Sequence, residues 1–464
     1  MASNDVEVKL ISKCFVKPKS QVEESKTPHY LLGTDLKWLS IRYIQTGFLY
    51  NKPITKDFDI NAFVEKLKQS LSHALVYYYP LAGRFTTVTY EDEHACSIYV
   101  DCNKGPGARF IHASCVHATV SDIAGYSNNM LPAIGPFCNL GEVELVCYDG
   151  HTRALLSLQV TELKDGVCVG ITMNHSIGDG SSFIHFVNSL SEICRSLIDQ
   201  EQTIPLSLMP IFKPFLPQGC NLLQKLPYLE PNEFISRVDN DPRLKEKIFH
   251  FSLSSISNLK KRVNSEWPEG LGKISSFQAL AALIWISINR AQKKSAQAIA
   301  VCIMPVNCRA LYNPPLSPAQ FGNHAQQLVI VRKVGELIEN GLVQAAVVIH
   351  QGILGYDHKV AAQRLKAMME NPTVLCLDES GENKDEINVV NFTWSSKFDI
   401  YGVDFGLGKP MAARNASSSK RDGRVVIRMA RDGIGSIDLE VSLCSETMMA
   451  LELDQEFMEF ASSF

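Results

Sequence analysis

The chain has 464 residues, of which 45% are hydrophobic and 20% are charged, and its formal net charge at pH 7 is −4. This composition is typical of a folded globular protein, and the length predicts two or three domains. The sequence pI of about 6.3 excludes a strongly basic surface of the kind that binds nucleic acid.

The start of the chain and its longest apolar run predict neither secretion nor membrane insertion. The first residues lack the apolar run of a signal peptide, and the apolar run 277–288 is too short to cross a bilayer. Thirteen cysteines are scattered without a CxxC pair, which favours reduced thiols in the cytosol. We therefore expect a cytoplasmic protein without a membrane partner.

The first element with a clear period is a helix over 59–75. Apolar side chains recur every four residues and form one face of this helix, and Asp59 is suited to cap its N-terminus. The apolar face consists of Phe63, Leu67, Leu71 and Leu75. Residues 95–102 and 153–163 are typical of strands.

The segment 166–186 predicts a strand, a tight turn and a helix. In GVCVGITMNH, alternate apolar residues share one strand face, and His175 is the next residue on that face. Gly178-Asp179-Gly180 then predicts a tight turn. The apolar residues from Phe183 to Leu197 follow a helical period, which indicates an amphipathic helix over 180–198.

A proline-rich stretch divides the chain. Six of the 21 prolines lie between Pro205 and Pro231, and proline is excluded from helix interiors. A structureless connection of this length is unusual inside one compact domain. The sequence therefore predicts an N-terminal domain over 1–200, a crossover over 201–235 and a C-terminal domain over 236–464.

The second half mixes strands and helices in the same way as the first. The expected strands lie at 248–254, 298–306 and 326–334, and the expected helices at 254–264 and 275–291. Residues 423–430 and 433–443 predict a hairpin near the end of the chain. The chain is thus expected to be an α/β protein.

The pattern His175-x-x-x-Asp179 is too short to identify a site without its context. His175 is an inert buried histidine, a metal ligand or a general base. A metal site would need a helix between the two residues, which Gly178 and Gly180 disfavour, and a third ligand. A base suits the end of a rigid strand, because imidazole titrates near neutral pH. Asp179 has a structural role in either case, as a helix N-cap or as the partner of a cation.

Two loops supply further candidate residues. Arg309 lies in VNCRALYNPPLSPAQFGN (306–323), as a solvated loop residue or as the cation that pairs with Asp179. The stretch DFGLGKP (404–410) predicts a turn in which Gly406 and Gly408 adopt backbone angles that other residues avoid.

Taken together, these segments resemble the plant BAHD acyltransferase family. HSIGDG is similar to the family's HxxxDG, and DFGLGKP is similar to its DFGWGKP with Leu407 in place of tryptophan. The other matching segments are YYYPLAGR, ISSFQALAALIW, the VNCR...NPP...FGN loop and FDIYGVDFGLGKP, and all occur in the family's order. The resemblance extends from about residue 7 to the C-terminus.

The resemblance implies two chloramphenicol-acetyltransferase-like α/β domains with mixed sheets, joined by a long crossover loop, with a solvent channel between them. His175 would lie midway along this channel. Asp179 would point away from the channel into a salt bridge with Arg309. The DFGLG turn would have a structural role away from the reacting atoms, with Asp404 in a supporting ion pair.

The implied reaction is direct acyl transfer from an acyl-CoA to a small-molecule acceptor in a ternary complex. His175 would remove a proton from the hydroxyl or amine that attacks the thioester, without a metal and without an acyl-enzyme. The family acts mostly through cytosolic monomers. By the family's pattern, Thr393 and Trp394 are candidates to stabilise the oxyanion.

Binding the phosphates of coenzyme A requires cations. Four basic residues are candidates for this role because of their positions in the chain. They are Arg290, Lys293, Lys294 and Lys409. A solvated charged face explains Lys293 and Lys294 equally well. Leu407 and Ile286, which stands where the family pattern leads us to expect arginine, are departures that bear on coenzyme A binding.

Three other functions remain open. A lyase-type member of the same family is one, although the presence of His175 favours transfer. A peptide-synthesis condensation domain would need a second histidine, where this chain has Asn174, and a carrier domain. A non-catalytic, ligand-binding member is the third, and Leu407 is the only residue that supports it.

Overall fold

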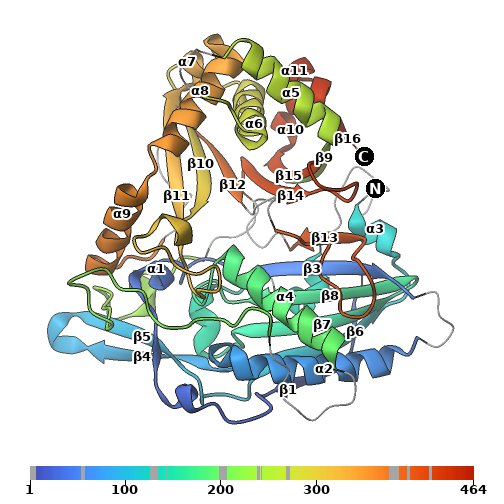
Figure 1. Ribbon diagram of the computed structural model, residues 1–464, viewed down its shortest axis with the longest axis vertical. Helices are drawn as coiled ribbons and strands as arrows, with labels where there is room; N and C mark the ends of the chain where they lie inside the picture. Colours follow the sequence, from blue (N-terminus) through green and yellow to red (C-terminus); the bar gives the residue numbers. More distant parts are fainter. Residues whose placement is uncertain are drawn as a thin grey trace.

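The computed structural model describes residues 7–53, 58–125, 134–142, 144–197, 206–237, 241, 243–267, 272–375, 386–393, 398–416 and 421–463. Two large mixed sheets, one above the other in Figure 1, organise these residues. No helix in the described part of the chain combines the length and the apolar character needed to cross a membrane.

The first half of the chain forms a six-stranded sheet and a small three-stranded sheet. The large sheet has the order β1-β6-β7-β8-β3-β13. Its strands are β1 (Lys9–Val16), β6 (Ala108–Cys115), β7 (Leu156–Leu163), β8 (Gly166–Met173), β3 (Ile44–Asn51) and β13 (Ala412–Asn415). Only β6 and β7 pair in parallel. The small sheet contains β2 (His29–Tyr30), β5 (Ala95–Asp101) and β4 (Arg84–Tyr90).

Two long helices pack together against the six-stranded sheet. These are α2 (Ile60–Tyr77) and α4 (Gly180–Ser196), which lie in front of the sheet in Figure 1. The side chain of Asp59 accepts a hydrogen bond from the backbone N–H of Asn61, so the predicted N-cap is confirmed. All four residues of the expected apolar face of α2 are buried. Short helices α1 (Gly33–Leu36) and α3 (Val120–Ala124) complete this half.

The second half forms a seven-stranded sheet with the order β11-β10-β12-β14-β15-β9-β16. Its strands are β9 (Leu244–Phe251), β10 (Ile299–Asn307), β11 (Ala325–Lys333), β12 (Ile387–Thr393), β14 (Arg424–Met429), β15 (Ile437–Cys444) and β16 (Ser462–Ser463). The predicted hairpin is confirmed, because β14 and β15 pair antiparallel.

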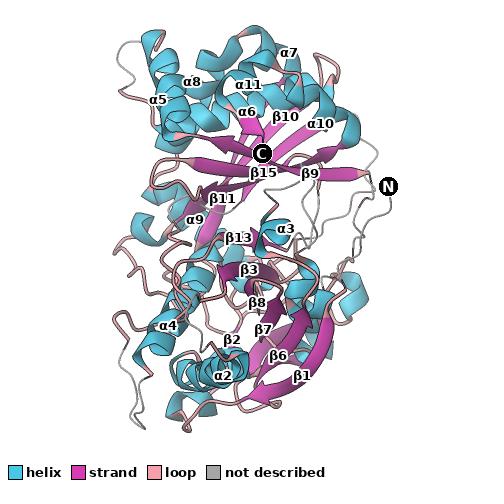
Figure 2. Ribbon diagram, turned by 90° about the vertical axis from the view of Figure 1, so that its right-hand side faces the viewer, coloured by secondary structure: helices cyan, strands magenta, loops and turns pink. Residues whose placement is uncertain are grey.

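Most helices of this half cover one face of that sheet, as Figure 2 shows. They are α5 (Leu253–Ser265), α6 (Ser276–Gln292), α7 (Val334–Glu339), α8 (Gly341–Leu354), α10 (Ser445–Glu452) and α11 (Gln455–Phe460). Helix α9 (His358–Glu370) packs against α1 of the first half. The contact is close, because a Cβ added to Gly33 would lie 1.9 Å from the backbone oxygen of Met368.

The proline-rich connection is extended, as its composition predicts. Residues 206–237, the part of the connection that is described, contain isolated bridges and one 3-10 turn but no α-helix. Ile211 bridges to Gln320 in the second half, and Leu226 bridges to Cys96 in the first. The connection therefore binds both halves along its length.

One segment of the expected C-terminal domain (236–464) packs with the N-terminal domain (1–200). Strand β13 pairs with β3 of the first half, and Ile400, Val403 and Phe405 join the hydrophobic core of the first half. These three apolar residues are buried there by packing against side chains of the first half. The N-terminal core therefore includes part of the C-terminal sequence.

Candidate active site

A strand, a turn and a helix place His175, as the sequence predicts. Strand β8 is buried along its whole length between β7 and β3, and it ends at Met173. The Asn174 side chain donates to the backbone oxygen of Cys147 at 2.7 Å and accepts from the backbone N–H of Ser176 at 3.0 Å. The backbone N–H of His175 contacts the sulfur of Cys147 at 3.1 Å. These contacts fix the backbone of His175 and of the residues before and after it.

The His175 ring is partly exposed, but its Nδ1 atom is buried and has no hydrogen-bond partner among the described residues. The pKa of His175 is lowered from 6.5, chiefly because the surrounding protein desolvates the ring, while polar contacts with the His175 backbone and the Asn323 side chain act to raise it. At neutral pH the ring is therefore uncharged.

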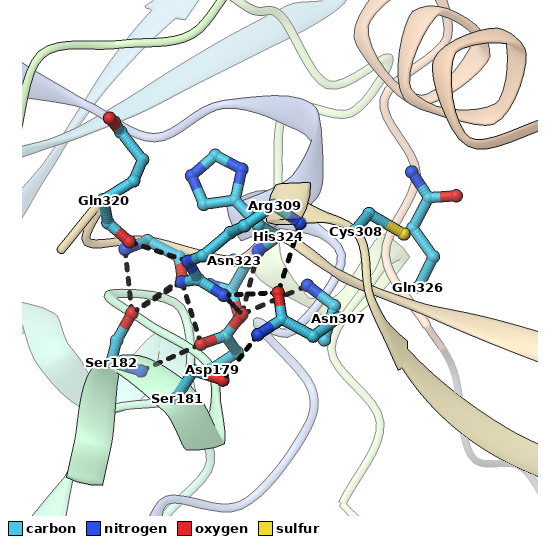
Figure 3. A network of polar contacts seen from close by, with 12 residues as sticks. Asp179, Ser181, Ser182, Asn307, Cys308, Arg309, Gln320, Asn323, His324 and Gln326 are labelled. Carbon is cyan, nitrogen blue, oxygen red and sulfur yellow. Dashed lines mark hydrogen bonds and ion pairs between the residues drawn. The ribbon is translucent and has the colours of Figure 1, made fainter. Parts of the chain in front are cut away.

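Asp179 and Arg309 form a buried ion pair, shown in Figure 3. The guanidinium donates to the two carboxylate oxygens at 2.8 and 3.1 Å, and the residues are 2% and 3% exposed. The pKa of Asp179 is lowered: burial acts to raise it, but the Arg309 charge and hydrogen bonds prevail. The ion pair expected from the sequence is thus present.

The carboxylate of Asp179 also connects two segments that are far apart in sequence. It accepts from the backbone N–H of Ser182, which caps α4, and from those of His324 and Ala325 at 3.0 and 3.1 Å. Arg309 donates further to the backbone oxygens of Gln320 and Gly322 (Figure 3). None of these contacts involves the ring of His175. Asp179 therefore fixes the turn, and the expectation that it does not transfer protons stays a prediction.

Asn323 and Asp35 form a further set of hydrogen bonds at His175, and the sequence analysis assigned no role to either. The Asn323 amide nitrogen donates to the backbone oxygen of His175 and to the carboxylate of Asp35, both at 2.9 Å. Burial raises the pKa of Asp35 to about 6. Asn323 belongs to the FGN segment, so its motif could have indicated it. Asp35 follows from no periodicity or motif, because it lies in a four-residue helix.

Trp38 is a third residue that the sequence did not indicate. Its ring stacks on the imidazole of His175, with 4.2 Å between ring centroids and 13° between ring planes. Trp38 follows α1 and is partly exposed. A lone tryptophan outside a periodic element carries no signal of such a contact, which only the tertiary structure reveals.

The DFGLG turn has the expected backbone. Gly406 and Gly408 have φ values of 91° and 82°, in the region that favours glycine. Asp404 makes no ion pair in the described part of the chain. Its carboxylate instead accepts from the backbone N–H groups of Gly406 and Gly408 at 2.7 and 2.9 Å. The carboxylate thus stabilises its own turn, and the supporting ion pair expected for Asp404 stays a prediction.

The same turn packs against the N-terminal domain. Ser191 of α4 donates to the backbone oxygen of Asp404 at 2.8 Å, and Leu407 packs partly buried against the N-terminal core. Leucine thus fills the position of the family's tryptophan with an apolar contact.

The two oxyanion candidates lie at the end of β12. Thr393 is partly buried, and its hydroxyl lies 3.5 Å from the backbone oxygen of Val425. Trp394 lies outside the described residues. The assignment of both residues stays a prediction.

Arg290 is held in ion pairs within the C-terminal domain, and its role with the phosphates of coenzyme A stays a prediction. Its guanidinium binds Asp454 at 2.8 and 3.0 Å and Glu456 at 2.9 Å. These carboxylates lie more than 160 residues later and begin α11, so the arginine connects α6 to α11. Position in the chain could not reveal these partners. Ile286, where arginine was expected, is fully buried in the C-terminal core.

The three lysines differ in their surroundings. Lys293 and Lys409 are exposed. Lys294 donates to the backbone oxygen of Ile387 at 3.0 Å. Lys293 and Lys294 follow α6, in the helical layer over the seven-stranded sheet (Figure 2). Their role with coenzyme A stays a prediction.

Replacing Arg290 with alanine is expected to reduce stability without changing the KM for acyl-CoA. The change leaves Asp454 without its arginine and Glu456 with Arg262 alone, and hydrogen bonds to charged groups contribute roughly 1.5–3 kcal/mol. Urea unfolding and steady-state kinetics measure the two quantities. The control is Lys261→Ala, at an exposed residue of α5 that is not among the candidates for coenzyme A. A KM that rises tenfold in Arg290→Ala with unchanged stability would contradict the structural role.

Metal ligands do not gather in the described part of the chain: it holds no group of three His, Cys, Asp or Glu side chains arranged to bind an ion. The cysteines within the described ranges are free thiols.

Comparison with known proteins gives consistent matches along the chain. The family model described as Transferase family matches residues 6–458. An uncharacterized acetyltransferase of Arabidopsis thaliana is 32% identical, with 98% of this chain and 99% of the relative aligned. BAHD acyltransferase DCR of the same plant is 30% identical over 98% of this chain and 93% of its own.

A solved structure has the same fold. TRI101 of F. graminearum, crystallised with ethyl coenzyme A, superposes with a TM-score of 0.71 at 18% sequence identity, covering 94% of this chain and 99% of that chain. The fold is thus the two-domain α/β fold that the sequence predicts.

Proposed function

Because the chain belongs to the Transferase family of BAHD acyltransferases, we propose that it transfers an acyl group from an acyl-CoA to a hydroxyl or amine of a small specialised metabolite, with His175 as the general base. The ethyl coenzyme A in the related fold of TRI101 supports coenzyme A as the carrier. We further propose that the enzyme acts as a cytoplasmic monomer.

The observation that carries this proposal is the state of the His175 ring. It is uncharged at neutral pH, it is partly exposed, and its backbone is held by Cys147 and Asn323. A base needs the first two properties to accept a proton, and the third to do so in one orientation. An inert core histidine would be enclosed and hydrogen-bonded at both nitrogens.

The proposed reaction is a direct transfer. Nε2 of His175 removes the proton of the acceptor as its oxygen or nitrogen attacks the thioester carbonyl. A tetrahedral oxyanion forms and then collapses, which breaks the carbon–sulfur bond. The thiolate of coenzyme A takes the proton back from the imidazolium. Each cycle thus restores neutral His175, and no cysteine needs to carry the acyl group.

The oxyanion requires a hydrogen-bond donor, and the removal of one such donor typically slows catalysis about 10²–10³-fold. Thr393 supports this role by its hydroxyl group and its place at the end of β12, where the hydroxyl makes one long contact with a described residue, at 3.5 Å from the backbone oxygen of Val425.

The pH dependence of the reaction follows from the lowered pKa of His175. Protonation removes the base, so activity falls as the pH drops through this pKa. Because the pKa lies below 6.5, we expect kcat/KM to stay level down to pH 6.5 and to fall below it. A pH profile of kcat/KM, which reports groups of the free enzyme, measures this. A midpoint well above 6.5 would contradict a neutral, desolvated base.

The main test is thiol release. The protein is incubated with acetyl-, malonyl-, benzoyl- or hydroxycinnamoyl-CoA and candidate alcohols or amines, and free coenzyme A is measured. Release that depends on both substrates supports transfer. Two alternatives give other results: a lyase-type member converts a single substrate without acyl-CoA, and a non-catalytic member binds coenzyme A by calorimetry without turnover.

A further inference from the structure

Trp38 covers one face of the proposed base. The ring centroids of Trp38 and His175 lie 4.2 Å apart, and the ring planes are within 13° of parallel. Their sequence positions are 137 residues apart, so neither local structure nor a shared element imposes this contact. It is a tertiary contact at the residue on which the reaction depends.

The stack is held from both sides by one set of hydrogen bonds. The backbone N–H of Trp38 donates to the backbone oxygen of Asp35 at 3.1 Å, and Ile41 donates to the Trp38 oxygen at 2.8 Å. Asp35 in turn accepts from Asn323, which donates to the backbone oxygen of His175. The indole and the imidazole are thus parts of one framework, and their relative position is restrained.

The arrangement has two consequences for a base. The indole blocks rotation of the imidazole toward one side, while the Nδ1 atom of the ring is buried. The indole face also carries negative electrostatic potential, which favours a cation lying against it. The imidazole becomes such a cation only after it has accepted the proton.

We propose that Trp38 is a positioning residue for acyl transfer, which holds the imidazole plane of His175 and stabilises the imidazolium formed during the reaction. The inference rests on the proposed function in that His175 must act as the base. It assigns to Trp38 a contribution through His175 rather than a contact with the reacting atoms.

Other charged groups also act on the ring. The negative charge of Asp179 favours the imidazolium, but Arg309 pairs with Asp179 and offsets that charge. The Lys37 ammonium, which lies 5.5 Å from the Trp38 ring centroid, disfavours the imidazolium. Two further titratable residues are linked to His175: Cys147 by the His175 backbone N–H and Asp35 through Asn323. Because Lys37 stays in place in every Trp38 variant, its effect is constant in the comparison.

The test compares Trp38→Leu with Trp38→Phe. Leucine keeps an apolar cover without an aromatic face, whereas phenylalanine keeps the face. The pKa of His175 is measured by NMR in protein with labelled histidine, and the resonance is assigned by its loss in His175→Gln. Trp38→Leu is expected to lower this pKa by about 0.5–1 unit and kcat about tenfold, while Trp38→Phe recovers most of both.

Three results would overturn the inference: an unchanged pKa and kcat in Trp38→Leu, an increase confined to KM, or an equal loss in Trp38→Phe. Thermal unfolding of each variant shows whether the fold is kept. The NMR titration needs no substrate, so it tests the stack even if thiol release fails. Activity that survives in His175→Gln would instead reject the proposed function and leave the measured pKa shift standing.

Discussion

Replacing His175 with glutamine is expected to slow acyl transfer by about 10²–10⁴-fold, the usual contribution of a general base. Glutamine is similar in size and polar, but it cannot accept a proton near neutral pH. Because the backbone of residue 175 makes the hydrogen bonds to Cys147 and Asn323, the substitution leaves them in place. The measurement is the rate of thiol release at saturating acyl-CoA and acceptor.

The matched control is His117→Gln, the same change at an exposed histidine, which is expected to have no effect. The thermal midpoint of His175→Gln should match that of the unchanged protein. Thiol release at the original rate in the folded variant would defeat the assignment of His175 as base. A loss confined to KM would indicate that His175 binds substrate without transferring a proton.

The parts of the site that could be predicted from the sequence depend on interactions between residues that are close together in the chain. The strand over 166–175 and the helix from residue 180 could be predicted, because alternation and helical periodicity are patterns of residues that are close together in the sequence. Asp59 and Asp179 could be recognised as caps for the same reason. The partner of Asp179 is a distant residue, Arg309, and only the resemblance to a family suggested it.

The parts that could not be predicted depend on contacts between distant residues. Strand β13 is short and pairs with β3, some 360 residues earlier in the chain. Arg290 binds carboxylates of the last helix, although its position suggested a phosphate ligand. Trp38 meets His175 only because Asp35 and Asn323 join the two segments. In each case, tertiary packing selects a partner that local pattern does not specify.

Removing one member of the Asp179–Arg309 pair is expected to be the most destabilising single change at the site. In Asp179→Ala, a guanidinium that is 3% exposed loses its counter-charge. Backbone N–H groups of Ser182, His324 and Ala325 lose their acceptor. Breaking a buried pair in this way costs about 3–5 kcal/mol. Urea unfolding of the single variant measures the loss in the free energy of unfolding.

A double variant separates the charge from the packing. Asp179→Leu combined with Arg309→Met leaves no buried charge, so its loss is expected to be smaller than the sum of the two single losses. The exposed pair Lys26–Glu23 provides the control, because Lys26→Ala removes a solvated contact and should produce little measurable change. Single variants as stable as the Lys26→Ala control would contradict the structural role of the pair.

The stability of the protein in acid provides an independent measurement of the same ion pair. The pKa of Asp179 is lower in the folded chain than its ordinary value of 3.8, so its contribution is present above pH 3.8 and is lost as the pH falls through the folded pKa. Asp179→Ala should therefore lose less stability than the unchanged protein between neutral pH and pH 3. Parallel declines in the two proteins would mean that folding does not lower the pKa of Asp179, and the turn that holds His175 would need another explanation.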